Sequence, residues 1–444
     1  MKNTISCAVV ALCLFVICNS SYAEQKTSKI GHVIIIMQEN RTTDNLFHDP
    51  VLIANGADIA SYGTNSKGKT IKLTSEPLDN NYNMNHEHTD FIHMYDGGKM
   101  DGADKIEVLC DPGSTGCPPA NAHFKYVQAS DVAPYFQMAE QYTFADQMFQ
   151  TNQGDSYPAH QFIVSGTSAP SATSKQFDVG NPAGVKNPTV STGCTAPTGE
   201  YVQLINPKGE LVGKSYPCFE HPTLTDLLDD AGLSWAYYTP TPNNIWTGLN
   251  IIKHIRLGTD WQYVIDNPRQ ILTDIQQSQL RDVSWVIPPG QLSDHPGSNN
   301  GGGPSWVASI VNAIGESSYW NDTAIFVTWD DWGGWYDHVV PNVVSDGVSW
   351  GSGLVYGFRV PLLVISPYAR AGYISHVPHD FGSILRFVEN NFDLPSLGYA
   401  DKYADDLSDC FNYKSFHQFK EIQAPLKADY FLNDTTEPTA PDED

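Results

Sequence analysis

Two adjacent carboxylates, Asp330 and Asp331, follow a β-branched apolar run in the segment TAIFVTWDDWGGWYDH, residues 323–338. The run predicts a buried strand, and ligands of open α/β sheets bind at the carboxyl ends of their strands. Paired carboxylates at that edge are natural oxygen ligands for a divalent cation. A polar turn explains the segment equally well when it is taken alone, because Asp and Gly also end strands for conformational reasons.

A second segment far away in the chain has the same organisation. Residues 32–40, HVIIIMQEN, form a continuous apolar run that ends in Glu39 and Asn40. Such a run is typical of a strand that is buried on both faces. Two strand ends that both supply oxygen ligands predict one shared metal site.

Further apolar runs alternate with helical patterns and predict the rest of the fold. The additional strands are expected within residues 233–240, 283–289 and 361–367, and the helices within residues 223–228, 305–314 and 382–391. This alternation predicts an α/β protein with a doubly wound, largely parallel sheet sandwiched by helices. Residues 55–102 and 181–218 are rich in Gly, Asn, Ser, Thr and Pro and are expected to form loop-rich insertions.

The chain ends predict export and an acidic tail. Residues 1–23 place Lys2 before a short apolar run and end in Ser21-Tyr22-Ala23, which is the pattern of a cleaved signal peptide. We therefore expect a periplasmic or secreted protein with one large domain over residues 24–433 and a disordered acidic tail over residues 434–444. Cleavage would change the formal charge from −25 to −26. Such a surface argues against nucleic acid and anionic membranes as partners.

Five cysteines remain after the expected cleavage. In an oxidising compartment, proximity favours pairing Cys110 with Cys117 and Cys194 with Cys218, each closing a short loop. Cys410 is then the odd cysteine, either free or available for an intermolecular bond.

Five segments, taken in order, carry a family resemblance. They are MQENRTTDNLF, GDSYPAH, LSDHP, TWDDWGGWYDHV and GFRVPLLVISPYARAGYISH. Together they resemble the bacterial phosphoesterase family of phospholipases C and respiratory-burst-inhibiting acid phosphatases, which belongs to the alkaline-phosphatase-like superfamily. The resemblance runs from about His32 to Pro395.

The resemblance implies roles for individual residues. Glu39 and Asn40 match the metal-binding pair of the family, Asp330 and Asp331 match its second acidic pair, and Ser156 falls at the position of the nucleophile and metal ligand. His86 and His295 match histidines that surround the phosphate, and His338 is expected to support them. The chain departs from the family pattern at Ala159 and Phe381, where Asn and His are frequent, and His88 competes with His86 for its role.

These residues imply an exported, metal-dependent phosphoesterase. We expect the cation, which is Ca²⁺, Mg²⁺, Mn²⁺ or Zn²⁺, to activate Ser156 for in-line attack on phosphorus, with a phosphoserine intermediate. The expected activity is a phospholipase C acting on phosphatidylcholine-like lipids, and the alternative is an acid phosphatase acting on phosphomonoesters. The expected partner is a phospholipid or small phosphoester, with at most transient membrane-surface contact through the substrate. A catalytically silent ligand-binding protein is the alternative from another class.

Overall fold

The computed structural model describes residues 28–184, 191–342 and 355–439. The expected signal peptide, residues 1–23, lies outside these ranges, as do residues 440–444 of the expected acidic tail. The described part of that tail makes contacts, since Asp434 pairs with Arg269 and the backbone N–H of Thr439 donates to Gln291 Oε1. None of the helices in the described ranges has the length and apolarity needed to cross a lipid bilayer.

An eight-stranded sheet forms the centre of the molecule and confirms the predicted α/β fold class. The strand order is β14 (Val264–Ile265), β13 (Trp235–Tyr238), β15 (Val283–Val286), β1 (His32–Gln38), β16 (Thr323–Trp329), β17 (Leu362–Ile365), β8 (Thr143–Ala145) and β18 (Tyr373–Ser375). Every neighbouring pair is parallel except the two pairs that include β17. The sheet is therefore largely parallel, as expected, and the predicted strand at 361–367 runs against its neighbours.

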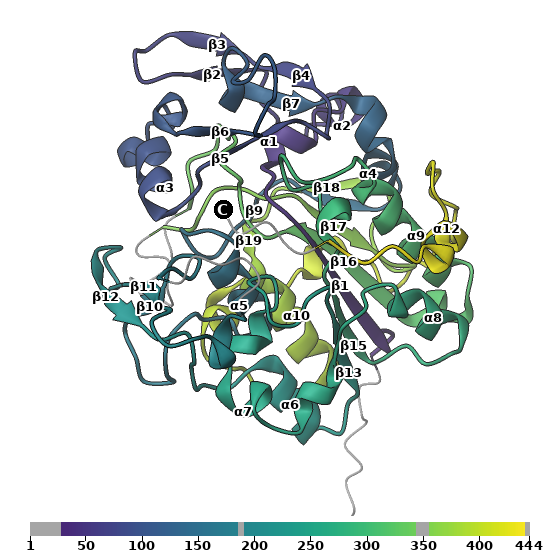
Figure 1. Ribbon diagram of the computed structural model, residues 1–444. Helices are drawn as coiled ribbons and strands as arrows, with labels where there is room; N and C mark the ends of the chain where they lie inside the picture. The colour runs from purple at the N-terminus through teal and green to yellow at the C-terminus, as the bar shows by residue number, and fades with distance from the viewer. Residues whose placement is uncertain (1–27, 185–190, 343–354, 440–444) are drawn as a thin grey trace, which may run out of the picture.

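The two central strands are apolar on both faces because helices cover both sides of the sheet. Val33 to Met37 of β1 are at most 1% exposed, and every residue of β16 is buried. Figure 1 shows one helical layer beside α9 and another beside α5 and α10. The first contains α4 (Ala129–Gln141), α8 (Gln270–Gln276), α9 (Gly303–Gly315) and α12 (Ala428–Asn433). The second contains α5 (Ser156–Ser165), α6 (Leu224–Asp230), α10 (Phe381–Phe392) and α11 (Ala400–Tyr403).

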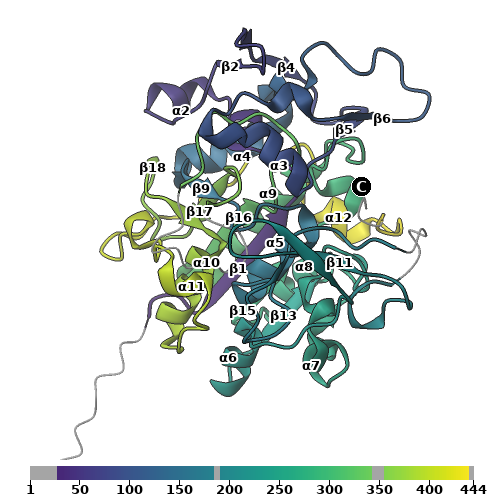
Figure 2. The ribbon, with the colours of Figure 1, turned by 90° about the vertical axis from the view of Figure 1, so that its left-hand side faces the viewer.

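The first predicted insertion builds a cap on the molecule. Its elements, with those that flank it, are α1 (Thr43–Leu46), α2 (Pro50–Ala54), β2 (Tyr62–Thr64), β3 (Thr70–Lys72), β4 (Thr74–Glu76), β5 (Tyr82–Met84), α3 (His88–Tyr95), β6 (Val108–Cys110) and β7 (Lys125–Val127). Strands β2, β4, β5 and β6 lie together at the top of Figures 1 and 2. The cap has its own apolar core, in which Met84 and Phe91 pack with Trp332 and Trp335 from the segment that follows β16. This packing holds the segment after Asp331 against the cap.

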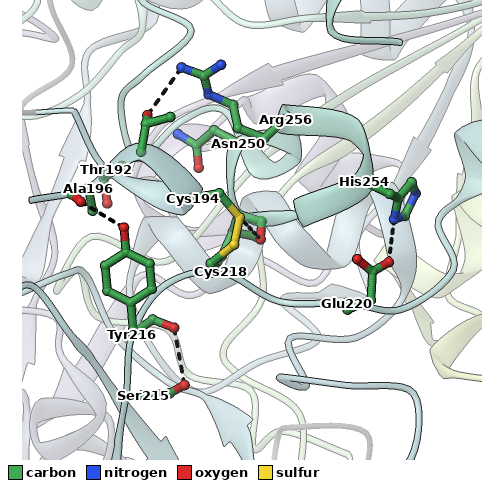
Figure 3. The surroundings of a disulfide bond; sticks show 12 residues. Thr192, Cys194, Ala196, Ser215, Tyr216, Cys218, Glu220, Asn250, His254 and Arg256 are labelled. Atoms are coloured by element: carbon green, nitrogen blue, oxygen red, sulfur yellow. Dashed lines mark hydrogen bonds and ion pairs between the residues drawn. A yellow bond between two sulfur atoms is a disulfide. The ribbon is translucent and has the colours of Figure 1, made fainter. Parts of the chain in front are cut away.

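The second predicted insertion carries a disulfide bond and two strands of a three-stranded sheet, whose remaining strand, β10, lies just before the insertion. The strands are β10 (Phe177–Asp178), β11 (Val202–Ile205) and β12 (Leu211–Ser215). Figure 3 shows the Cys194–Cys218 bond, which lies close to α7 (Lys253–Arg256). Near this disulfide, Tyr216 donates a 2.7 Å hydrogen bond to Ala196 O.

The disulfide pattern confirms the pairing expected from proximity. The bonds are Cys110–Cys117 and Cys194–Cys218. Cys410 is a free, fully buried thiol.

Candidate active site

The ends of β1 and β16 bring the two predicted acidic pairs together. These strands are neighbours, with Gln38 in register with Trp329, so Glu39 and Asp330 leave the sheet side by side. The backbone N–H of Asp330 donates to Gln38 O at 2.9 Å, and the backbone N–H of Asn40 donates to Asp330 Oδ1 at 2.9 Å. All four side chains of the two pairs are fully buried. The structure therefore brings the two predicted acidic pairs together at one edge of the sheet, and their role as metal ligands stays a prediction.

Left-handed backbone at two positions allows this close approach. Asn40 has φ 60°, a conformation that Asn tolerates better than most residues. Gly333 has φ 58°, and a Cβ there would lie 2.3 Å from Asn40 O, so only glycine fits. The N–H of Gly333 donates to Asp331 Oδ1 at 2.7 Å, which fixes the orientation of that carboxylate.

Ser156 reaches the same group from the other side of the sheet edge. It is the first residue of α5, and its Oγ donates a hydrogen bond to Asp331 Oδ2 at 3.2 Å. The N-terminus of a helix is the positive end of its dipole, which favours a bound phosphate. In α5 the N–H of Tyr157 already donates to Asn181 Oδ1 at 2.9 Å, and Pro158 has no N–H. The predicted nucleophile therefore lies where a phosphate would be held.

His86 is the histidine of its segment that joins the site. Its Nε2 lies 3.0 Å from Asn40 Nδ2 and 3.6 Å from Asp331 Oδ2, while its Nδ1 lies 2.8 Å from Met84 O. His88 instead contacts Gly209 O in the second insertion. His93 is about half exposed and lies 3.7 Å from Asp90. Of these three histidines, His86 is thus the one that contacts the two acidic pairs, and its role at the phosphate stays a prediction.

His160 is a member of the group that sequence reasoning missed. It lies one helical turn after Ser156 on α5, and its Nε2 is 3.1 Å from Glu39 Oε1 and 3.9 Å from Asp330 Oδ2. Residues four apart share a helix face, so the spacing from Ser156 to His160 was a usable signal. Glu39, His160 and Asp330 each offer one ligand atom, and these three atoms lie within 4.8 Å of one another.

The electrostatics of this group fit a cation. Burial, together with the nearby charge of Asp330, raises the pKa of both Glu39 and Asp331 well above the usual range. Burial lowers the pKa of His160 to about 4, so that the imidazole is neutral and able to act as a ligand. Glu39 Oε2, Asn40 Oδ1 and Asp330 Oδ2 are buried without hydrogen-bond partners, and a divalent cation would satisfy such oxygens.

The other two predicted histidines, His295 and His338, make different contacts from those of His86. The loop of His295 runs beside Glu39, whose N–H donates to Ser293 O at 2.8 Å, and His295 Nδ1 lies 2.9 Å from Pro296 O. His338 lies in an ion-pair cluster, 2.7 Å from Asp44 Oδ2 and 3.0 Å from Asp58 Oδ1. Catalytic roles for both histidines stay predictions.

A comparison with protein families decides the class of this site. The model of the Phosphoesterase family matches residues 30–395. The chain belongs to the phosphoesterase family. This membership confirms the predicted resemblance and the prediction of a hydrolase that acts on phosphoric esters. The group at the ends of β1 and β16 is the candidate active site of this phosphoesterase.

Individual relatives of this phosphoesterase carry phospholipase C names. It is 26% identical to the hemolytic phospholipase C of Pseudomonas aeruginosa over 82% of this chain and 53% of that protein. It is 25% identical to phospholipase C B of Mycobacterium tuberculosis over 86% of this chain and 78% of that protein. The chain thus spans about half the length of the first relative. A solved Vibrio parahaemolyticus protein of the alkaline phosphatase superfamily is similar with a TM-score of 0.37 and 12% identity, over 86% of this chain and 70% of that chain.

Proposed function

We propose that this phosphoesterase is a metal-dependent phospholipase C that uses Ser156 as its nucleophile and acts on phosphatidylcholine-like lipids. The observation that carries the proposal is the position of Ser156 Oγ, which lies at the N-terminus of a buried helix and donates to Asp331 Oδ2 at 3.2 Å. A hydroxyl held by a carboxylate at the N-terminus of a helix is suited to attack a phosphoryl group.

We assign the metal to the group at the strand ends. Its ligands would come from Glu39, Asn40, Asp330, Asp331 and Ser156, and His160 adds a nitrogen donor. A bound divalent cation supplies positive charge that lowers the pKa of a nearby hydroxyl and offsets the charge of a phosphoryl group. A set of oxygen ligands suits Ca²⁺, Mg²⁺ or Mn²⁺, and an imidazole ligand favours Zn²⁺ among the four candidates.

The protein groups then have separate tasks. Ser156 Oγ forms a bond to phosphorus while the bond to the leaving oxygen breaks, which gives a phosphoserine and an alcohol. The positive dipole end of α5 stabilises the charge of the phosphoryl oxygens. His86 and His295 are the proposed donors to those oxygens, and one of them protonates the departing oxygen. Attack of water on the phosphoserine returns Ser156 as a free hydroxyl and releases the phosphorylated product. His338 is proposed to support the site through the loop that carries Asp337.

One observation favours the alternative acid phosphatase. The aromatic residues after β16 could bind a choline group by cation–π contact if their faces were open. Trp332 and Trp335 are instead fully buried in the core of the cap, and Trp335 already stacks on the guanidinium of Arg41. A phosphomonoester needs no choline pocket, so this activity is the second candidate.

Export and a signal peptide belong to the same proposal. The phospholipase C names of the relatives and the two disulfide bonds support an oxidising compartment, either the periplasm or the medium. Contact with a membrane surface would then be limited to the substrate lipid, and the acidic surface disfavours nucleic acid.

The test compares two substrates under matched controls. The purified chain and its Ser156→Ala variant are assayed on p-nitrophenyl phosphorylcholine and p-nitrophenyl phosphate, before and after chelation and with each divalent metal added back. We expect turnover of the choline diester that is lost in the variant and on chelation. Ser130→Ala, which removes an exposed hydroxyl near the N-terminus of α4, is the control and should keep full activity.

Each result has a distinct meaning. Preference for the monoester under the same controls would make the protein an acid phosphatase. Unchanged activity in Ser156→Ala would rule out this nucleophile. Binding of both phosphoesters without turnover at any metal would indicate a silent binding protein.

A further inference from the structure

Four side chains with metal-binding chemistry gather at the β18 edge of the sheet, away from the candidate active site. They are His379 of β19 (His379–Asp380), Asp409 and Cys410 of the 3₁₀ helix Ser408–Cys410, and Asp405. The ligand atoms of His379, Asp409 and Cys410 lie within 4.8 Å of one another. His379 and Cys410 are at most 1% exposed, so the group is shielded from water on most sides.

The distances in this cluster are close to those of a tetrahedral zinc site. Zinc bonds of about 2.3 Å to sulfur and about 2.0 Å to oxygen place the two ligand atoms about 3.5 Å apart, and a nitrogen–oxygen pair about 3.3 Å apart. Cys410 Sγ lies 3.5 Å from Asp409 Oδ1, and His379 Nε2 lies 3.7 Å from the same oxygen. Two of the three separations are thus within a few tenths of an ångström of the values for one tetrahedral ion, and all three ligand atoms lie within 4.8 Å of one another.

A carboxylate also lies beside the second ring nitrogen of His379. Histidines that bind metals usually direct their second ring nitrogen at a carboxylate, which fixes the ring. His379 Nδ1 lies 3.1 Å from Asp405 Oδ1, at ion-pair distance although not in the direction of a hydrogen bond. Ser375 Oγ lies 3.1 Å from His379 Nε2 and donates to Asp409 Oδ2, which adds an oxygen donor to the group.

We propose that His379, Asp409 and Cys410 bind a zinc ion, with Ser375 beside them and Asp405 orienting His379. Sulfur, nitrogen and oxygen donors together favour zinc over calcium or magnesium. Binding releases one proton, because the Cys410 thiol becomes a thiolate. The thiolate and one carboxylate then balance the charge of the ion.

The ion would hold a segment that leads to the candidate nucleophile. β19 pairs with β9 (Met148–Phe149), and Asp380 accepts a 2.9 Å hydrogen bond from Thr151, five residues before Ser156. A bound ion would join β19 to the C-terminal 3₁₀ helix and so stabilise the start of this segment. The site is thus a stabilising one, independent of the metal in the proposed reaction.

The test uses cobalt in place of zinc in the chain without residues 1–23, which carry Cys7, Cys13 and Cys18. Thiolate–cobalt bonds give an ultraviolet charge-transfer band that oxygen and nitrogen ligands do not give, and the other four described cysteines are in disulfides. We expect the band in the unmodified chain and in Asp330→Asn, which removes a ligand of the proposed catalytic metal. We expect its loss in Cys410→Ser, together with the loss of one equivalent of zinc by elemental analysis.

A second variant keeps the test decisive if Cys410→Ser does not fold. His379→Gln should keep the thiol but weaken zinc binding at least about 10-fold. Far-ultraviolet circular dichroism of each variant shows whether it is folded. The proposal would be overturned if the cobalt-loaded chain lacked the band, or if the zinc content were the same in all variants. His379, Asp409 and Cys410 would then form only a hydrogen-bonded network.

Discussion

The backbone N–H of Asn40 donates a 2.9 Å hydrogen bond to Asp330 Oδ1 and so joins the ends of β1 and β16. This bond fixes the left-handed conformation of Asn40, from which its side chain reaches His86. Through these two contacts, Asn40 positions the carboxylate of Asp330 and the ring of His86, a candidate phosphate ligand.

Replacement of Asn40 should separate its backbone role from its side-chain role. Asn40→Gly and Asn40→Ala both remove the amide, and we expect both to lower kcat/KM at least about 10-fold. Asn40→Ala should also be less stable than Asn40→Gly by about 1 kcal/mol, since alanine disfavours a positive φ. Urea unfolding measures the difference. The same pair at Asn121, an exposed residue with φ 54°, should show the stability difference with no loss of activity.

His160→Gln should weaken metal binding more than it weakens folding. The amide can still donate to Glu39 Oε1, but it is a poorer metal donor than imidazole. We expect the affinity for Zn²⁺ or Mn²⁺ at the active site to fall about 10- to 100-fold, as measured by calorimetry. His221→Gln, at another buried histidine, is the control. Unchanged affinity in His160→Gln would show that His160 only buttresses Glu39.

The His338 cluster predicts a loss of stability at alkaline pH. Burial alone would lower the pKa of His338, but the Asp44 hydrogen bond and charge outweigh it and raise the pKa to about 9. Because the pKa in the folded state is raised, His338 stabilises the fold fully below the unfolded-state pKa of about 6.5. This stabilisation is lost as the pH rises to about 9. His338→Gln should therefore flatten the fall in unfolding free energy between these pH values, by about 1–2 kcal/mol.

A second histidine provides a control for this pH dependence. The hydrogen bond to Asp226 raises the pKa of His254 to about 9, so the unmodified chain should carry both contributions. His254→Gln should remove its own share independently, because the two clusters lie in different parts of the chain. An unchanged pH profile in His338→Gln would mean that His338 is not charged in the folded protein.

The two disulfide bonds should differ in their contribution to stability. Cys194–Cys218 closes a separation of 24 residues and Cys110–Cys117 one of 7. The entropy of loop closure then predicts losses of about 3 and 2 kcal/mol respectively when each pair is changed to serine. Thermal unfolding of the two double variants checks the order. A larger loss at Cys110–Cys117 would indicate that the cap, rather than chain entropy, limits stability.

The sequence by itself determined the central strands and the acidic pairs at their ends. Continuous β-branched runs such as residues 33–37 fit only a strand covered on both faces, and the residue that follows must lie at the sheet edge. Short separations likewise determined both disulfide pairs. Ser156 was identified only through the family resemblance, and the structure places it against Asp331. The strands, the acidic pairs and the disulfide pairs each depend on residues that are close together in the sequence, so a local sequence pattern is enough to predict them.

Only the tertiary structure decided which distant side chains meet. His160 contacts Glu39 because α5 packs at the end of β1, while His88 faces the second insertion and Trp332 enters the core of the cap. The antiparallel direction of β17, the short strand β8 and the short edge strands β14 and β18 were also beyond local patterns. Each of these depends on long-range packing, for which a single sequence holds no periodic signal.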